Sequence, residues 1–234
     1  MNQSGSGNTG DIVQTETGTY SMAYIEQSAD NGSATIFQGD FQGGNFGDFG
    51  EAHIYQLSGS GNEASIKQRS HGVWNDHEIT QRGVANSASI DAYNGGQRGD
   101  IYQQGTNNSA TLKQAHSGIN RADIDQGGSG NGYNVVGNTA TVQQNRGDNN
   151  YARVRQAGDG NTIAGSAIDR DGLGWYGIQQ QGHDNDAYAI QTGSFNTGAI
   201  SQFGMHDDAN LVQSGLGNTG SIIQGTNPAA MGGS

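Results

Sequence analysis

The stretch from Asn108 to Gln114 reads Asn-Ser-Ala-Thr-Leu-Lys-Gln, and its pattern decides the fold of this chain. Closely related stretches run from Asn62 to Gln68 and from Asn120 to Gln126, which gives the shared pattern Asn-x-Ala-x-Ile-x-Gln. The pattern closes eighteen times, usually at intervals of 11 to 13 residues. The closing residues are Gln14, Gln27, Gln38, Gln56, Gln68, Gln81, Ala92, Gln103, Gln114, Gln126, Gln144, Gln156, Arg170, Gln180, Gln191, Gln202, Gln213 and Gln224. A short repeat of this regularity indicates a solenoid or a related repeat architecture.

The regular positions of the repeat all lie two residues apart. Two residues before the closing position stands a large aliphatic residue, four before it a small residue, and six before it often an asparagine. A period of two is that of a β-strand, in which alternate side chains share one face. We therefore expect inward ladders that include Asn62, Ala64, Ile66, Gln68, Asn108, Ala110, Leu112, Gln114, Asn120, Ala122, Ile124, Gln126, Asn196, Ile200 and Gln202.

Charged residues occupy the positions between the inward ones. Lys67, Glu78, Asp123 and Arg153 are examples, and they are expected to point outward. Gly- and Asn-rich segments such as 59–62 separate the strands, and these residue types tolerate the positive φ angles of tight turns.

Like residues stack on like when each repeat lies on the second repeat along the chain. This arrangement gives parallel, in-register strands whose Asn and Gln amides bond to their own kind. An antiparallel meander would place Asn opposite Gln and lose these ladders. We therefore predict an all-β fold, a two-sided β-solenoid of about nine rungs over residues 8–224, with a short lead at 1–7 and an irregular tail at 225–234.

Three segments break the period. Two of them lie between Gln38 and Gln56 and between Gln126 and Gln144, and the third runs from Ile163 to Trp175 with Arg170 at a glutamine position. We interpret all three as widened arcs between strands, and a contact or secretion feature is the alternative.

Composition excludes several classes of protein. Only 31% of residues are hydrophobic, 41 are Gly and one is Pro, which is too little apolar surface for a conventional two-layer core. The net charge of −12 repels polyanions, so no nucleic-acid partner is expected. There is no cysteine for disulfides or thiolate metal sites, and no apolar run approaches the length of a transmembrane helix.

No constellation of catalytic residues is recognisable. The six His show no metal-ligand spacing, only His77 falls on an inward position, and the carboxylates are scattered over outward positions. The segment Gly158-Asp-Gly-Asn161 lacks the full series of a calcium-binding roll. We expect no enzyme activity, no cofactor and no metal site.

The pattern resembles the curlin repeat of bacterial curli subunits. The segments from Gln103 to Gln114 and from Gln202 to Gln213 show it well, and the resemblance extends from Asn8 to Gln224. It implies a secreted, major-subunit-like protein of an extracellular amyloid fibre in a biofilm matrix, with adhesion as a role. It also implies a nucleator subunit, an outer-membrane secretion pore and a periplasmic chaperone as partners. Met1 leads directly into polar residues without a signal peptide, which fits a mature segment or a cytosolic protein.

The first and last repeats both obey the pattern, so both ends of the solenoid are expected to be open. Such ends can continue the ladders of another copy, in a head-to-tail contact that does not close. The expected end interfaces are Asn8, Ile12 and Gln14 at one end and Asn218, Ile222 and Gln224 at the other.

Two alternatives stay open at this stage. One is the minor nucleator of the same fibre, which would be expected to have an atypical terminal repeat. The other is a monomeric binding solenoid, such as an ice-binding protein, which needs a regular Thr array on one outward face. The outward positions taken together mix Lys, Glu, Tyr, Thr, Phe and Asp, so we do not expect such an array.

Overall fold

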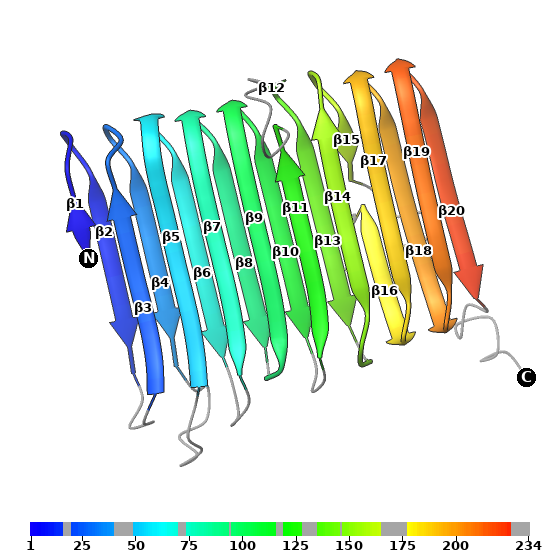
Figure 1. Ribbon diagram of the computed structural model, residues 1–234, viewed down its shortest axis with the longest axis horizontal. Coiled ribbons are helices and arrows are strands. Elements are labelled where there is room, and N and C mark those ends of the chain that lie inside the picture. The colour runs from blue at the N-terminus through cyan, green and yellow to red at the C-terminus, as the bar shows by residue number, and fades with distance from the viewer. Residues whose placement is uncertain are drawn as a thin grey trace, which may run out of the picture.

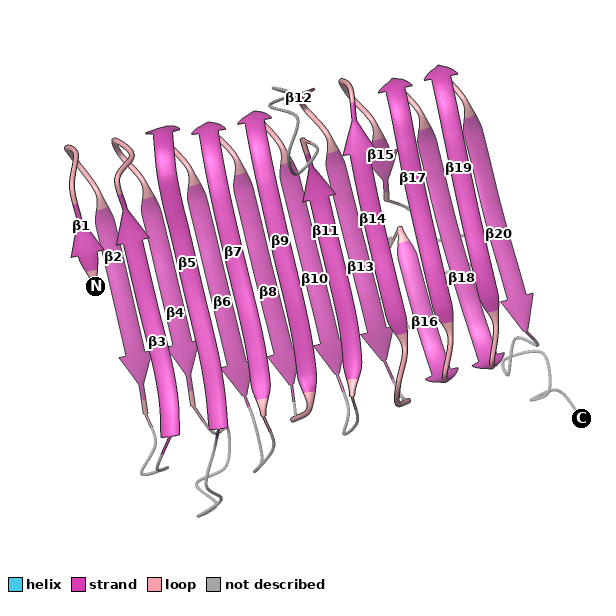
Figure 2. Ribbon diagram, in the orientation of Figure 1, coloured by secondary structure: helices cyan, strands magenta, loops and turns pink. Residues whose placement is uncertain are grey.

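The computed structural model describes residues 1–15, 20–39, 49–69, 74–93, 95–115, 119–127, 135–145, 147–164 and 177–225. These residues form strands β1 to β20 and no helix. The strands make two ten-stranded parallel sheets that face each other along the length of the solenoid (Figure 1), and short turns join them (Figure 2). The prediction of an all-β, two-sided β-solenoid is confirmed.

Successive strands alternate between the two sheets. Sheet A contains β1 (Asn2–Gln3), β3 (Tyr20–Gln27), β5 (Phe49–Ser60), β7 (Asn75–Val84), β9 (Gln97–Thr106), β11 (Asn120–Gln126), β12 (Val135–Val136), β14 (Tyr151–Ala157), β17 (Asp186–Ser194) and β19 (Asp208–Leu216). Sheet B contains β2 (Thr9–Gln14), β4 (Ser33–Gln38), β6 (Glu63–Arg69), β8 (Ser87–Tyr93), β10 (Ser109–Ala115), β13 (Thr139–Asn145), β15 (Thr162–Ile163), β16 (Ile178–His183), β18 (Thr197–Met205) and β20 (Thr219–Gly225).

The register places equivalent residues of the repeat next to each other. Leu112 of β10 lies between Ile90 of β8 and Val142 of β13, and Gln114 aligns with Gln144. Because the side-chain period is two, this register keeps the aliphatic residue that stands two before each closing position on the inner face of its sheet.

The core is a single aliphatic layer between the sheets. Its largest fully buried side chains are Ile25, Ile36, Ile54, Ile66, Ile79, Ile90, Ile101, Leu112, Ile124, Ile163, Ile178 and Ile200. Each such side chain stabilises the fold by roughly 1.5–3 kcal/mol when it is buried. The small residues at the neighbouring inward positions let the two sheets approach across this layer.

The turns depend on glycine where successive arcs stack. Gly83 has a φ of 113°, and a Cβ atom added to it would overlap the backbone carbonyl of Gly105 in the next arc. Gly59 meets Gly83 in the same way. The stacked arcs therefore need a residue without a side chain that can also adopt positive φ.

The third break in the period differs from the predicted widened arc. Thr162–Ile163 of β15 pair with residues 139–140 of β13, and Ile178–Gln180 of β16 pair with residues 142–144 of the same strand. The two short strands therefore occupy the two halves of one strand position in sheet B. A separate repeat closing at Arg170 is wrong, because Gln144 aligns directly with Gln180; Arg170 itself lies outside the described residues.

The other breaks lie mostly outside the described residues, at 40–48 and 128–134. At the second of them β12 pairs with Gly105 and Thr106 at the end of β9.

The lead at residues 1–7 is not separate from the solenoid, because Gln3 of β1 pairs with Gln27 of β3. Of the expected tail, 226–234 lie outside the described residues.

Candidate functional site: the amide ladders and the solenoid ends

A glutamine ladder runs through sheet A from one end to the other. In every link the Nε2 of one glutamine donates to the Oε1 of the next, at distances from 2.6 Å at Gln3–Gln27 to 3.0 Å at Gln56–Gln81. Its members are Gln3, Gln27, Gln56, Gln81, Gln103, Gln126, Gln156, Gln191 and Gln213. The donor always points toward the carboxyl-terminal end, so the ladder has a direction.

From Gln27 onward, each amide also bonds to the backbone of the opposite sheet. Gln103 Nε2, for example, donates to the carbonyl of Ser87 at 3.0 Å as well as to Gln126 Oε1 at 2.9 Å. Gln103 is fully buried, and a buried amide without partners would cost about 1–3 kcal/mol per group. The ladder therefore satisfies its own polar atoms and ties the two sheets together.

The asparagine ladders run in the opposite direction. Asn86 Nδ2 donates to Asn62 Oδ1 at 3.1 Å, and Asn108 Nδ2 donates to Asn86 Oδ1 at 3.1 Å. In sheet A, Asn150 Nδ2 donates to Asn120 Oδ1 at 3.1 Å. Here the donor points toward the amino-terminal end, opposite to the glutamines.

The inward residues expected from the sequence lie in these ladders and in the aliphatic layer between them. None of the fifteen is more than 6% exposed, and the most exposed is Ala64. Two of the three quoted stretches, ending at Gln68 and Gln114, lie in sheet B, and the one ending at Gln126 lies in sheet A.

The glutamine ladder of sheet B lacks an amide at one rung. Gln14, Gln38 and Gln68 form its first part, and Gln114, Gln144, Gln180, Gln202 and Gln224 form the second. The intervening position on β8 is Ala92, which aligns with both Gln68 and Gln114. A methyl group can neither donate nor accept a hydrogen bond.

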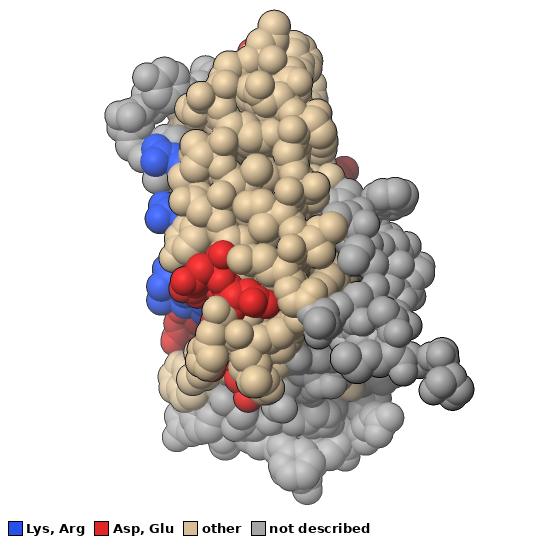
Figure 3. All heavy atoms as spheres, turned by 90° about the vertical axis from the view of Figure 1, so that its right-hand side faces the viewer, with Lys and Arg blue, Asp and Glu red and all other residues tan. Residues whose placement is uncertain are grey.

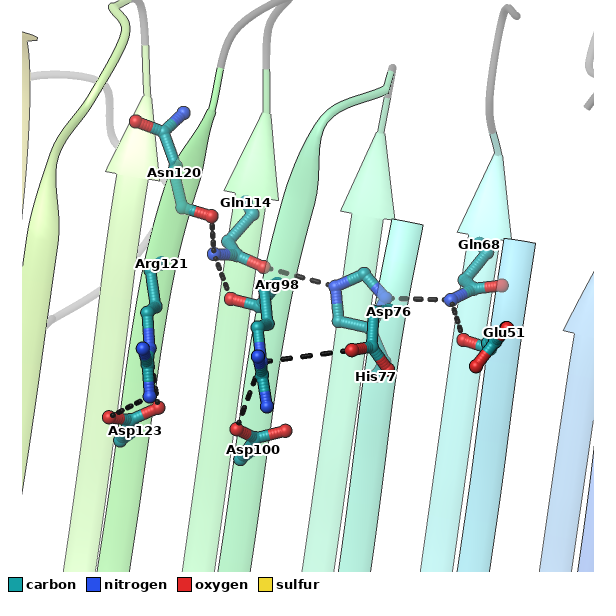
Figure 4. A network of polar contacts seen from close by, with 10 residues as sticks. All are labelled: Glu51, Gln68, Asp76, His77, Arg98, Asp100, Gln114, Asn120, Arg121 and Asp123. Atoms are coloured by element: carbon teal, nitrogen blue, oxygen red, sulfur yellow. Dashed lines mark hydrogen bonds and ion pairs between the residues drawn. The ribbon is translucent and has the colours of Figure 1, made fainter. Parts of the chain in front are cut away.

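His77 of the facing sheet takes the place of the missing amide. Its Nδ1 lies 2.7 Å from Gln68 Nε2, and its Nε2 lies 3.1 Å from Gln114 Oε1 (Figure 4). His77 is fully buried on β7, where most repeats have a small residue. Gly99 on β9 leaves space beside the ring, since a Cβ added to it would overlap Leu112 Cδ2 and lie 3.0 Å from His77 Cδ2.

The ladder fixes the tautomer of His77. Gln68 Nε2 also donates to the carbonyl of Glu51 at 2.8 Å, and Gln68 Oε1 accepts from Gln38 Nε2 at 2.8 Å. Nδ1 is therefore the acceptor, and Nε2–H donates to Gln114 Oε1. The imidazole thus keeps the donor-to-acceptor direction of the ladder.

Burial makes this imidazole hard to protonate. Loss of solvation lowers the pKa of His77 from 6.5 to about 4, against smaller opposing effects of the Gln114 hydrogen bond and the Asp76 charge. Sequence reasoning identified His77 as inward and Ala92 as a missing glutamine but did not connect them. His77 and Ala92 lie opposite each other in two facing sheets, and the sequence alone does not show that placement.

The solenoid ends present the open ends of these ladders. In sheet B the amino-terminal end presents Gln14 Oε1, while Gln224 Nε2, at the carboxyl-terminal end, has only the carbonyl of Asp208 as its acceptor among the described residues. Ile12 and Ile222 are partly exposed at the two ends, unlike the fully buried Ile36 between β2 and β6.

The two terminal strands of sheet B have closely similar sequences. β2 is Thr-Gly-Asp-Ile-Val-Gln, and β20 begins Thr-Gly-Ser-Ile-Ile-Gln. β20 contains no charged residue, and much of the described surface at this end is uncharged, with acidic side chains to one side (Figure 3).

The outer faces of the two sheets differ sharply in composition. On sheet A, charged and aromatic residues predominate; one column across the strands is Tyr24, His53, Glu78, Asp100, Asp123, Arg153 and Tyr188. Arg98 lies 3.4 Å from Asp100, and Arg121 lies 3.3 Å from Asp123. Burial raises the pKa of Asp100 to about 6 despite Arg98, with Asp123, Asp76 and Glu78 adding to the rise.

Serine and threonine predominate on the outer face of sheet B. One column holds Thr9, Ser33, Glu63, Ser87, Ser109, Thr139, Thr162, Thr197 and Thr219, and the next holds Asp11, Thr35, Ser65, Ser89, Thr111 and Thr141. These columns are not a regular Thr array, because serines, Glu63 and Asp11 interrupt them, but the expectation from the sequence missed that the hydroxyl groups gather on one sheet. It pooled all outward positions, whereas alternate repeats belong to different sheets.

Among the described residues no three His, Cys, Asp or Glu side chains gather as they would around a metal ion. The same part of the chain offers no helix long and apolar enough to cross a membrane. No protein-family model, curated protein or solved structure matches this chain.

Proposed function

We propose that this protein is a structural subunit that stacks head-to-tail with copies of itself into an amyloid-type fibre. The observation that carries the proposal is that directional amide ladders run to both ends and are open there. A donor at the carboxyl-terminal end, Gln224 Nε2, matches an acceptor at the amino-terminal end, Gln14 Oε1. Asn218 Oδ1 adds an acceptor at the former end, whereas Asn8 Nδ2 near the latter already donates to the carbonyls of Ser4 and Ala29.

The terminal strands of sheet B fit each other in register. β20 stacked on β2 of the next copy places Ile222 on Ile12, Gln224 on Gln14 and Thr219 on Thr9. The outward Asp11 then meets Ser221, so no two like charges face each other in this pair of strands. Contact between two like ends would instead place oxygen against oxygen or amide nitrogen against amide nitrogen along the glutamine ladder.

Such a contact buries the strand edges and aliphatic side chains that are exposed at the two ends. Because the contact repeats in one direction without closing, it produces a filament. The resemblance of the repeats to curlin supports an extracellular fibre in a biofilm matrix, where it would serve adhesion. It also provides the partners: a nucleator subunit, a periplasmic chaperone and an outer-membrane pore.

The test uses one blocked end at a time. Ile12→Lys introduces a charge at the amino-terminal end and Ile222→Lys at the carboxyl-terminal end, with the outward Ser221→Lys as the matched control. Thioflavin fluorescence, electron microscopy and sedimentation are measured on each protein alone and on mixtures.

We expect fibres from the unmodified protein and from Ser221→Lys. Each inward variant alone should stay monomeric, and an equimolar mixture of the two should stop at dimers, since only one compatible joint remains. Fibres from either inward variant alone, or a stable thioflavin-negative monomer of the unmodified protein, would contradict the proposal.

The hydroxyl columns of sheet B favour a second candidate function, a monomeric solenoid that binds ice. Strands spaced by about 4.8 Å and columns separated by roughly 6.6 Å make the array regular in two directions. Inhibition of ice growth by the monomer, abolished by Thr111→Lys on sheet B and retained by Glu78→Lys on sheet A, would support it. Equal ice growth with and without the protein would exclude it.

A further inference from the structure

The rung at Ala92 is the one place in the described glutamine ladders where a titratable group replaces an amide. An amide stays neutral at any physiological pH, whereas an imidazole changes its charge in mildly acidic solution. We propose that His77 is an acid-sensitive latch, whose protonation at Nδ1 breaks the sheet B ladder between Gln68 and Gln114 and loosens the layers around β8. The proposal concerns the folded chain and stands whether or not copies stack.

Protonation is incompatible with the contacts of Nδ1. This nitrogen accepts a hydrogen bond from Gln68 Nε2 at 2.7 Å, so a proton there would face another N–H. Rotation of the Gln68 amide would remove the conflict but would turn its oxygen toward the carbonyl of Glu51 and its nitrogen toward Gln38 Nε2. The contact with Gln114 Oε1, in contrast, would survive, because Nε2 remains a donor.

The charged and titratable groups on the neighbouring strands sit on the outer faces of the sheets. They are Asp76, Glu78 and Arg82 on β7, Glu51, His53 and Tyr55 on β5, Arg98, Asp100 and Tyr102 on β9, Glu63, Lys67 and Arg69 on β6, Asp91 and Tyr93 on β8, and Lys113 on β10. Inside, the ring contacts Gln68, Gln114 and the space beside Gly99. No described carboxylate forms a hydrogen bond to the imidazole, so a buried imidazolium would lack a counter-charge.

The sign of the effect follows from the lowered pKa. The unfolded chain binds a proton at His77 below pH 6.5, whereas the folded chain does so only near pH 4. The contribution of neutral His77 to the free energy of unfolding is complete above pH 6.5, falls between pH 6.5 and 4, and is lost below pH 4. Asp100 acts in the opposite direction, because its raised pKa favours the folded state as the pH falls toward 4.

The chain offers a matched control variant. His77→Ala together with Ala92→Gln restores the small residue and the closing glutamine of the common repeat, giving an uninterrupted amide ladder without a titratable group. Both this double variant and the unmodified protein carry Asp100→Asn in the experiment, which removes the opposing titration.

Urea unfolding is measured from pH 7.5 to 4, together with hydrogen exchange in β6–β10 relative to β17 and β19 in the same molecule. For the protein with His77, the unfolding equilibrium constant should rise on the order of 10²-fold more than that of the double variant between pH 7 and 4. Its extra exchange should be confined to β6–β10.

Parallel pH profiles for the two proteins would overturn the proposal, as would acid-induced exchange spread evenly over the solenoid. If the double variant does not fold, ¹⁵N shifts of His77 in the unmodified chain decide the matter. The Nε2–H tautomer that persists to about pH 4, with exchange rising as it disappears, supports the latch, and titration near pH 6.5 without increased exchange refutes it.

Discussion

The glutamine ladders of the two sheets solve the same problem with different chemistry. In sheet A, Gln81 and Gln103 continue the ladder with amides from the same sheet, whereas in sheet B an imidazole from the facing sheet bridges Gln68 and Gln114. Both solutions keep one donor and one acceptor per rung in a constant direction. The comparison teaches that the ladder requires continuity of donors and acceptors, and that a side chain from the opposite sheet can supply it.

The largest expected effect comes from a charge placed in the continuous ladder. Gln103→Lys would bury an ammonium group and leave Gln81 and Gln126 without their partner, so it should lower the free energy of unfolding by about 4 kcal/mol or more. The neighbouring outward Tyr102→Lys is the control and should change stability by less than about 1 kcal/mol. Similar losses for both, measured by urea unfolding, would invalidate the inward and outward assignment.

The bridged rung should respond to a double-mutant cycle. His77→Ala removes the bridge from Gln68 and Gln114 and leaves a cavity, which should cost roughly 2–5 kcal/mol. Ala92→Gln in the same molecule should recover most of that loss, while Ala92→Gln alone should crowd the histidine and destabilise. Additive effects of the two substitutions, obtained from unfolding at pH 7.5, would mean that the positions are not coupled.

A smaller effect is expected from Asp100 on the outer face. Its pKa is raised to about 6, chiefly by burial, so the carboxylate form is disfavoured in the folded chain at neutral pH. Asp100→Asn should therefore raise stability at pH 7 and lose this advantage progressively as the pH falls from about 6 to about 4. The difference between the two proteins across that pH range is the measurement, and a variant that is less stable at pH 7 would contradict the assigned cause.

The smallest effect is expected from the ion pairs of sheet A. Arg121 lies 3.3 Å from Asp123, and its side chain is 48% exposed. Exposed pairs contribute about 0–1 kcal/mol, so Arg121→Gln should change the urea midpoint little, and less still in high salt. A loss comparable to that of His77→Ala would show that the outer network holds the sheets as firmly as the inner ladder does.

Much of the fold follows from local periodicity. The spacing of two between Asn108, Ala110, Leu112 and Gln114 determined which face each residue occupies, and the repeated order predicted parallel, in-register stacking. The third interruption was predicted less well. Ile163 and Ile178 stand in one strand position although fourteen residues separate them, and no local pattern shows which distant residues will pair.

The composition of the outer faces was likewise predicted only in part. Alternation predicted that Thr111 and Glu78 both point outward, but only the assignment of their strands to different sheets separates a hydroxyl face from a charged one.

By itself, then, the sequence determined the strands, their inward residues and the likeness of the first and last repeats, because these depend on side-chain period and on similar repeats. Tertiary structure alone decided that His77 completes the rung at Ala92, that Gly99 gives it room, and that glutamine and asparagine ladders run in opposite directions. Those features depend on which atoms meet across the core, and hydrogen-bond direction arises only when the amides are stacked in space.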